Sequence, residues 1–113
     1  MTIRNLTRGT LIAETGSLAK TPLKRMTGLL GRGALNSGEA LVITPCRSIH
    51  MLFMKFPLDV IFIDRANTAV GLCPDIRPFQ FSPFFLQAHS AIETSAGTIA
   101  ASQTHMGDNI QIG

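Results

Sequence analysis

The 113-residue sequence contains no tryptophan and no tyrosine, and only 15% of its residues are charged. The missing aromatic residues are side chains on which nucleic-acid bases commonly stack. The ten Lys and Arg residues give a net charge of only +3 and are scattered, so they form no dense basic stripe. Because 45% of the residues are apolar, a disordered chain is excluded as well. We therefore expect a folded protein that does not bind nucleic acid.

Long apolar runs are also missing. No stretch approaches the roughly 18 apolar residues of a transmembrane helix, and residues 1–15 lack the apolar core of a secretory signal. We therefore expect a soluble, cytoplasmic protein without a membrane span. Cysteine is scarce, since the chain has only Cys46 and Cys73. The two can form one disulfide, but reduced thiols are the usual state in the cytosol, and we favour that state.

The length fits one domain over residues 1–113, and no repeat or linker divides it. Short alternating segments predict strands, and helical spacing after Thr21 and Pro22 predicts a helix. The expected strands are a hairpin within 2–14 and the segments 39–44, 49–54, 59–63, 68–73, 88–94 (half-buried) and 109–112, and the expected helices are 21–30 and about 96–103. This order predicts a mainly β (α+β) fold, an antiparallel β-sandwich or partly closed barrel, with one or two short helices.

The stretch from Cys46 to Asp64, CRSIHMLFMKFPLDVIFID, holds most of the chemically distinctive residues. Its β-branched and aromatic run at 60–63 predicts a strand buried on both faces. Asp59 directly precedes that run and needs a hydrogen-bond donor, which Arg25 or His50 can supply. Glu93, in the middle of a predicted strand, has the same need. Asp108, which follows a glycine, is expected to be a turn residue.

Cys46 and His50 are spaced so that the two side chains can point the same way, as a thiolate–imidazole pair or two metal ligands require. A structural zinc site needs four ligands, and Cys73, His89 and His105 do not arrive as paired motifs. A packed thiol beside a hydrogen-bonded histidine is the plainer interpretation, so we predict no metal, no cofactor and no catalytic residue. An enzyme that uses Cys46 and His50 stays open as an alternative.

The segment from Phe79 to Phe85 carries four phenylalanines, two between Pro78 and Pro83 and two directly after Pro83. We expect an irregular flap whose rings pack on the core. The alternative is an exposed apolar patch that meets a partner protein.

Three stretches of the chain resemble the domain of unknown function 192 family. They are Arg25–Arg32 (RMTGLLGR), Pro45–His50 (PCRSIH) and Phe53–Asp64 (FMKFPLDVIFID), and Ala91–Glu93, Ala96–Thr98 and Gly107–Asp108 resemble the closing segment. The resemblance covers about residues 20–112. It departs at 92–97, where the family usually has Leu-Glu-Leu-Pro-Ala-Gly, and in the phenylalanine-rich stretch 79–85.

The resemblance implies a compact, jelly-roll-like β fold with helices at its ends, and it implies no established reaction. Family members often carry leader peptides, but this chain shows none. We therefore predict a non-catalytic binding or accessory module whose partner is a small molecule or a protein. The candidate ligand-binding residues are Arg25, Cys46, His50, Met54, Asp59 and Glu93. The alternatives are the Cys46–His50 enzyme and a protein-docking subunit that uses the Phe79–Phe85 segment.

Overall fold

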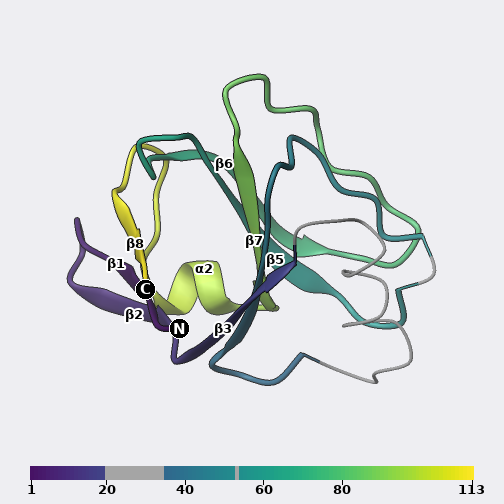
Figure 1. Ribbon diagram of the computed structural model, residues 1–113. Coiled ribbons are helices and arrows are strands. Elements are labelled where there is room, and N and C mark those ends of the chain that lie inside the picture. The colour runs from purple at the N-terminus through teal and green to yellow at the C-terminus, as the bar shows by residue number, and fades with distance from the viewer. Residues whose placement is uncertain (20–34, 53) are drawn as a thin grey trace.

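The computed structural model describes residues 1–19, 35–52 and 54–113, which form a mostly β structure with two sheets and one short helix (Figure 1). The five-stranded sheet has the order β3-β4-β7-β5-β6, and the three-stranded sheet has the order β2-β1-β8. The elements are β1 (Ile3–Asn5), β2 (Thr10–Ala13), β3 (Thr15–Ala19), β4 (Glu39–Ile43), β5 (Leu58–Ile63), β6 (Ala69–Ile76), β7 (Ser90–Ser95), α2 (Thr98–Ala101) and β8 (Ile110–Ile112). The mainly β prediction is confirmed, and the described strands close no barrel.

Strand β5 is buried along its whole length, as its apolar run predicts. Because side chains alternate across a strand, Leu58, Val60 and Phe62 join one hydrophobic cluster, whereas Ile61 and Ile63 join the cluster on the other face. Strand β7 lies between β4 and β5 and is equally buried, so the prediction of a half-buried strand there is wrong. Its neighbours in the sheet leave it no free edge, and the two hydrophobic clusters cover its two faces.

Most of the other expected elements are confirmed with small changes of length. The N-terminal hairpin, β4, the antiparallel β5–β6 hairpin and β8 lie where they were expected, and the second helix is shortened to Thr98–Ala101. Strand β6 continues through Pro74 to Ile76, which is possible because β6 is an edge strand. The expected helix over 21–30 lies outside the described residues.

Two expectations about strands are wrong. Residues 49–54 form no strand in the described part of the chain, where only a single bridge joins His50 to Phe81. Strand β3 was not predicted, because its sequence TGSLA has one large apolar residue and a glycine. It pairs with β4 in parallel, and this long-range contact leaves no local signal in the sequence.

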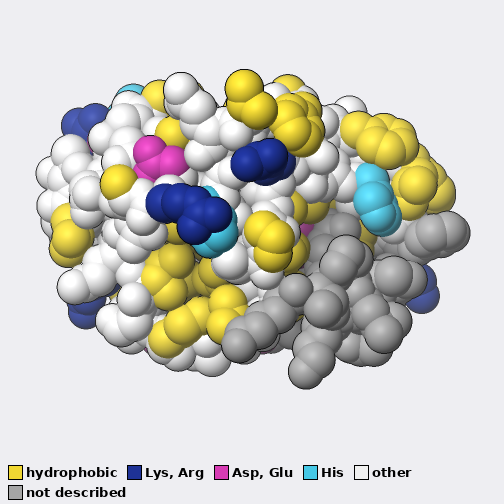
Figure 2. Space-filling view, turned by 45° about the horizontal axis from the view of Figure 1, so that its top comes forward, with side chains coloured by type: hydrophobic (Ala, Val, Ile, Leu, Met, Phe, Trp, Pro, Cys, Tyr) yellow, Lys and Arg dark blue, Asp and Glu magenta, His cyan; other side chains and the backbone are white. Residues whose placement is uncertain are grey.

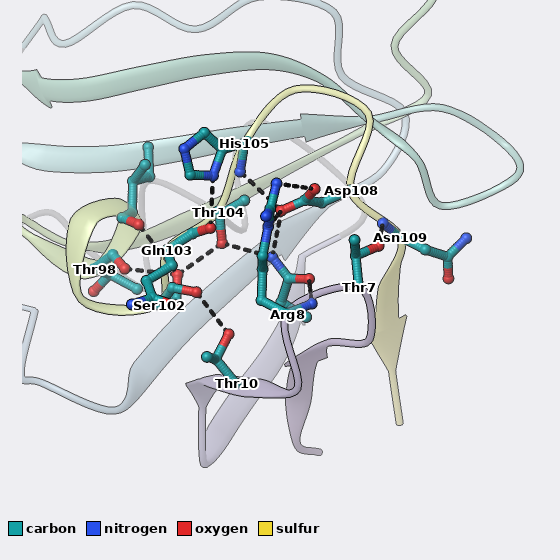
Figure 3. Close-up of polar contacts among 12 residues, drawn as sticks. Thr7, Arg8, Thr10, Thr98, Ser102, Gln103, Thr104, His105, Asp108 and Asn109 are labelled. Carbon is teal, nitrogen blue, oxygen red and sulfur yellow. Dashed lines mark hydrogen bonds and ion pairs between the residues drawn. The ribbon is translucent and has the colours of Figure 1, made fainter.

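A buried polar network ties the two ends of the chain together (Figure 3). Asp108 is 3% exposed, and its carboxylate accepts hydrogen bonds from the Asn5 amide, the Arg8 guanidinium and the His105 backbone N–H. Asp108 closes a turn as expected, since its backbone N–H donates to the His105 carbonyl at 3.1 Å, but its buried carboxylate has a structural role beyond that turn. These contacts, with the Arg8 hydrogen bond first among them, lower the pKa of Asp108 to about 2.

No helix in the described part of the chain is long and apolar enough to cross a membrane.

Candidate functional site

A cleft of about 1080 Å³ opens at one end of the five-stranded sheet. Strands β4 and β5 both run antiparallel to β7, so the carboxyl ends of β4 and β5 meet the start of β7 at that end. The cleft is lined by residues 43, 45–50, 64–66, 84 and 87–89, all of them at or beyond these strand ends. Figure 2, in which the top of Figure 1 comes forward, shows basic and histidine side chains beside hydrophobic ones on this face.

Backbone hydrogen bonds through His89 hold the walls of the cleft together. Its N–H donates to the Ile63 carbonyl at 2.8 Å, and its carbonyl accepts from the Cys46 N–H at 2.9 Å. Arg47 Nε donates to the Ala88 carbonyl at 3.3 Å. The residues that line the cleft therefore sit on loops that are fixed to the ends of the sheet.

Two of the six predicted site residues, Cys46 and His50, line this cleft. Cys46 is half-buried, and its Sγ donates to the Ser48 carbonyl at 3.2 Å. His50 is exposed, and its ring lies 6.5 Å from that of Phe81. The sequence spacing therefore identified two residues that share one cavity.

Asp59 lies away from the cleft, and its donors differ from those expected. The side chain is 1% exposed, and its two oxygens accept the backbone N–H groups of Asp75 and Ile99, each at 2.8 Å. Backbone amides of β6 and α2 are thus the hydrogen-bond donors to Asp59, a role that His50 was expected to have. Arg25, the other expected donor, lies outside the described residues. The carboxylate joins three elements and has a structural role.

Met54 and Glu93 also lie away from the cleft lining. Met54 belongs to the hydrophobic cluster that contains Val60 and Phe62. Glu93 is fully buried in β7 between Leu41 of β4 and Val60 of β5. No buried side-chain nitrogen or oxygen of the described residues lacks a hydrogen-bond partner, and this includes the Glu93 carboxylate.

Three basic residues of the cleft were not among the predicted site residues: Arg47, Arg65 and His89, of which His89 was considered only as a metal ligand. Asp64 also lines the cleft without having been predicted as a site residue. Its Oδ1 accepts the backbone N–H groups of Ala66 and Thr68, each at 2.9 Å. A usable signal for Arg47 and His89 was present in the sequence, because residues 46–56 and 77–89 contain no Asp or Glu.

The two cysteines lie in the structure as separate thiols. Cys73 is opposite Val60 in the β5–β6 ladder, outside the residues that line the cleft. Partial burial raises the pKa of the Cys73 thiol. Cys46 is therefore the thiol to consider for chemistry at the cleft. Among the described residues, no three His, Cys, Asp or Glu side chains cluster as metal ligands would.

The phenylalanine-rich segment divides between core and surface. Phe85 packs on Phe62 with ring centroids 4.6 Å apart, as the expected flap requires. Phe79, Phe81 and Phe84 are between 63% and 70% exposed, so for these three rings the expectation of packing on the core is wrong.

A family model described as "Uncharacterized ACR", the domain of unknown function 192, matches residues 4–112. A curated relative named UPF0127 protein, from Thermococcus sibiricus, is 32% identical over 110 residues, which cover 94% of this chain and 71% of the relative.

Two solved structures share the fold. The structure of a protein of unknown function from Novosphingobium aromaticivorans is 21% identical with a TM-score of 0.79, and the match covers 98% of this chain and 82% of that one. A structure described as a putative transcription regulator, from Sinorhizobium meliloti, is 20% identical with a TM-score of 0.74, and the match covers 97% and 89%. At these identities the likeness concerns the fold alone.

Proposed function

This chain belongs to the domain of unknown function 192 family, and on that premise we propose that it is a non-catalytic binding module whose cleft takes a small anionic ligand. The family model is described as uncharacterised, so the ligand class has to come from the residues of the cleft. The observation that carries the proposal is the excess of basic side chains over carboxylates in a cavity of ligand size.

The charges of the cleft favour an anion. Arg47 and Arg65 line it together with His50 and His89, and Asp64 is its one carboxylate among the described residues. Oδ1 of Asp64 already accepts two backbone amides. Arg65 is exposed, and no hydrogen bond or ion pair joins it to another described residue. A guanidinium in this position is suited to a carboxylate or phosphate, which it can bind through two parallel hydrogen bonds.

The size and lining of the cleft favour a small molecule. Its volume of about 1080 Å³ lies near the upper end of the range for ligand pockets. Apolar side chains, among them Ile43, Ile49 and Phe84, line it beside the basic groups. A mostly apolar lining with a few charged groups is typical of sites that bind organic ligands.

The test compares the thermal stability of three proteins in inorganic phosphate, succinate and a neutral succinamide control. A ligand that binds only the folded state raises the melting temperature, and the stabilisation grows with the logarithm of the ratio of ligand concentration to Kd. We expect the anions to stabilise the wild-type chain and Arg4→Gln, in which an exposed arginine of β1 is removed. Arg65→Gln should lose most of that stabilisation, since one charged hydrogen-bonding partner contributes about 1.5–3 kcal/mol. Equal shifts in all three proteins, or shifts with the neutral compound, would exclude the basic cleft as the binding site.

An enzyme that uses Cys46 and His50 is the second candidate, because both residues line the same cleft. A nucleophilic cysteine needs a lowered pKa and access to solvent. The rate at which Cys46 reacts with a thiol reagent, measured from about pH 5 to 9 in a Cys73→Ala background, decides between the two candidates. A fast reaction at low pH that slows in His50→Ala supports the enzyme. An ordinary thiol profile that His50→Ala leaves unchanged supports the binding module.

A further inference from the structure

Phe79 occupies a turn position that normally belongs to glycine. The Gln80 N–H donates to the Arg77 carbonyl at 3.0 Å, with Pro78 second and Phe79 third in the turn. The φ of Phe79 is +68°, and a turn of this kind favours Gly or Asn at its third residue. A bulky side chain there strains the backbone. Its ring is 70% exposed, so burial of the ring within the described fold does not offset the conformational strain of the backbone.

The strained turn begins a segment that carries four exposed apolar side chains, here called the phenylalanine rim. Its members, with their exposed fractions, are Phe79 (70%), Phe81 (67%), Phe84 (63%) and Leu86 (72%). They lie on the segment between β6 and β7, which reaches the top of the molecule in Figure 1. Scattered exposed apolar residues are ordinary on a protein surface, but four within eight residues form a patch that needs an explanation.

The backbone beneath the rim is held in place by the neighbouring segment. The Met51 N–H donates to the Gln80 carbonyl, and the Ser82 N–H donates to the Ile49 carbonyl, both at 2.8 Å. The Phe85 N–H donates to the Arg47 carbonyl, and the Phe85 ring is anchored on Phe62. The exposed rings therefore project from a fixed scaffold, which reduces the entropy lost when they enter a partner.

The segment that carries the rim and the neighbouring segment hydrogen-bonded to it are free of acidic residues. Residues 46–56 and 77–89 contain Arg47, Lys55, Arg77, His50 and His89, and no Asp or Glu. Arg77 forms an exposed ion pair with Asp75 at 2.9 Å, and such a pair gives way easily to another anion because both groups are solvated. The surface around the rim thus combines projecting apolar rings with positive charge.

We propose that the phenylalanine rim docks this protein onto an anionic membrane surface. Phe and Leu side chains gain free energy when they leave water for the acyl boundary, and nearby Lys and Arg side chains contact lipid phosphates. An anionic lipid surface offers both partners together, an apolar layer beneath a dense layer of phosphates. The contact is peripheral, through one loop segment, and it leaves the sheet and its core intact.

The first test is co-sedimentation with vesicles of phosphatidylcholine alone and of phosphatidylcholine mixed with phosphatidylserine. We expect binding to the mixed vesicles that weakens as salt is raised, because the charges are exposed. Phe79→Ser combined with Phe81→Ser should weaken binding at least about tenfold. The matched control, Leu6→Ser combined with Met106→Ser, removes exposed apolar side chains elsewhere and should bind like the wild type. Circular dichroism confirms that both variants are folded.

A fluorescent reporter then identifies the face that makes the contact. The sequence has no Trp or Tyr, so Phe81→Trp introduces a single reporter without background. Its emission should shift to the blue on mixed vesicles, whereas a reporter at Leu6→Trp should not respond. Absence of vesicle binding, equal binding to both vesicle types, or a response of the Leu6 reporter would overturn the proposal. Self-association that Phe79→Ser with Phe81→Ser abolishes, in the absence of vesicle binding, would assign the rim to a second copy of the chain instead.

Discussion

Phe85 owes its position to a glycine on the neighbouring strand. Gly71 lies opposite Phe62 in the β5–β6 ladder, and the ring of Phe85 covers both residues. A Cβ atom at position 71 would lie 2.6 Å from Cε1 of Phe85, a separation that real contacts do not reach. Glycine inside a strand is usually unfavourable, but here it admits the aromatic ring that restores the packing.

Gly71→Ala should therefore destabilise the protein by about 1–3 kcal/mol, because the ring has to leave its position on Phe62. In a Phe85→Leu background the same substitution should cost much less, since the branched side chain can move away. Urea unfolding of the four proteins gives the coupling between the two sites. An equal cost of Gly71→Ala in both backgrounds would show that the ring is not the obstacle.

At the scale of elements, Asp59 joins β5 to both β6 and α2. Its two carboxylate oxygens accept the Asp75 N–H from β6 and the Ile99 N–H from the first turn of α2. Helix α2 has no side-chain hydrogen bond from its own N-cap residue, Gly97, so the cap is supplied by a distant strand. One buried carboxylate thereby fixes the helix on the face of the sheet.

Asp59→Ala should destabilise the protein by about 2–5 kcal/mol, because it leaves the buried Ile99 amide and the part-buried Asp75 amide without an acceptor. The matched control is Asp64→Ala, which also removes an acceptor of two backbone amides, but in a turn that water can reach. Its cost should be about 1 kcal/mol. Chemical denaturation measures both, and similar costs for the two variants would contradict the assigned role of Asp59.

At the scale of the whole molecule, the first and last strands are held together by the network around Asp108. Strand β1 pairs with both β2 and β8. Asn5, the last residue of β1, and Arg8, which follows it, donate to the carboxylate of Asp108 near the other end of the chain (Figure 3). The small sheet therefore depends on contacts between residues about one hundred positions apart.

Acid should weaken the contacts that Asn5 and Arg8 make with the Asp108 carboxylate. The pKa of Asp108 is about 2 in the folded protein and 3.8 as an ordinary aspartate. A lowered pKa gives stability that is present above pH 3.8 and is lost as the pH falls toward 2. We expect the free energy of unfolding to fall through that range in the wild type and more gently in Asp108→Asn. Urea unfolding at several pH values checks this, with Asp75→Asn, which removes an exposed carboxylate, as the control that should keep the wild-type slope.

Local sequence patterns were sufficient wherever an element carries its own signal. The run at 60–63 gave a doubly buried strand, and the Asp64–Asn67 turn gave an antiparallel hairpin. The spacing of Cys46 and His50 selected two residues that line one cleft. The prediction of a strand over 49–54 was wrong because Ile49 and Met51 point into the core, while the backbone pairing of this segment with residues 79–82 is limited to a single bridge between His50 and Phe81 among the described residues.

The sequence by itself determined the class of the fold, its family and the position of its central strand, because apolar periodicity and turn residues act over a few residues. The tertiary structure alone decided the parallel pairing of β3 with β4, the acceptor role of Asp59, the burial of Asp108 and the basic cleft of Arg47, Arg65 and His89. Each of these depends on groups far apart along the chain, whose distance in space is set only when the sheets assemble.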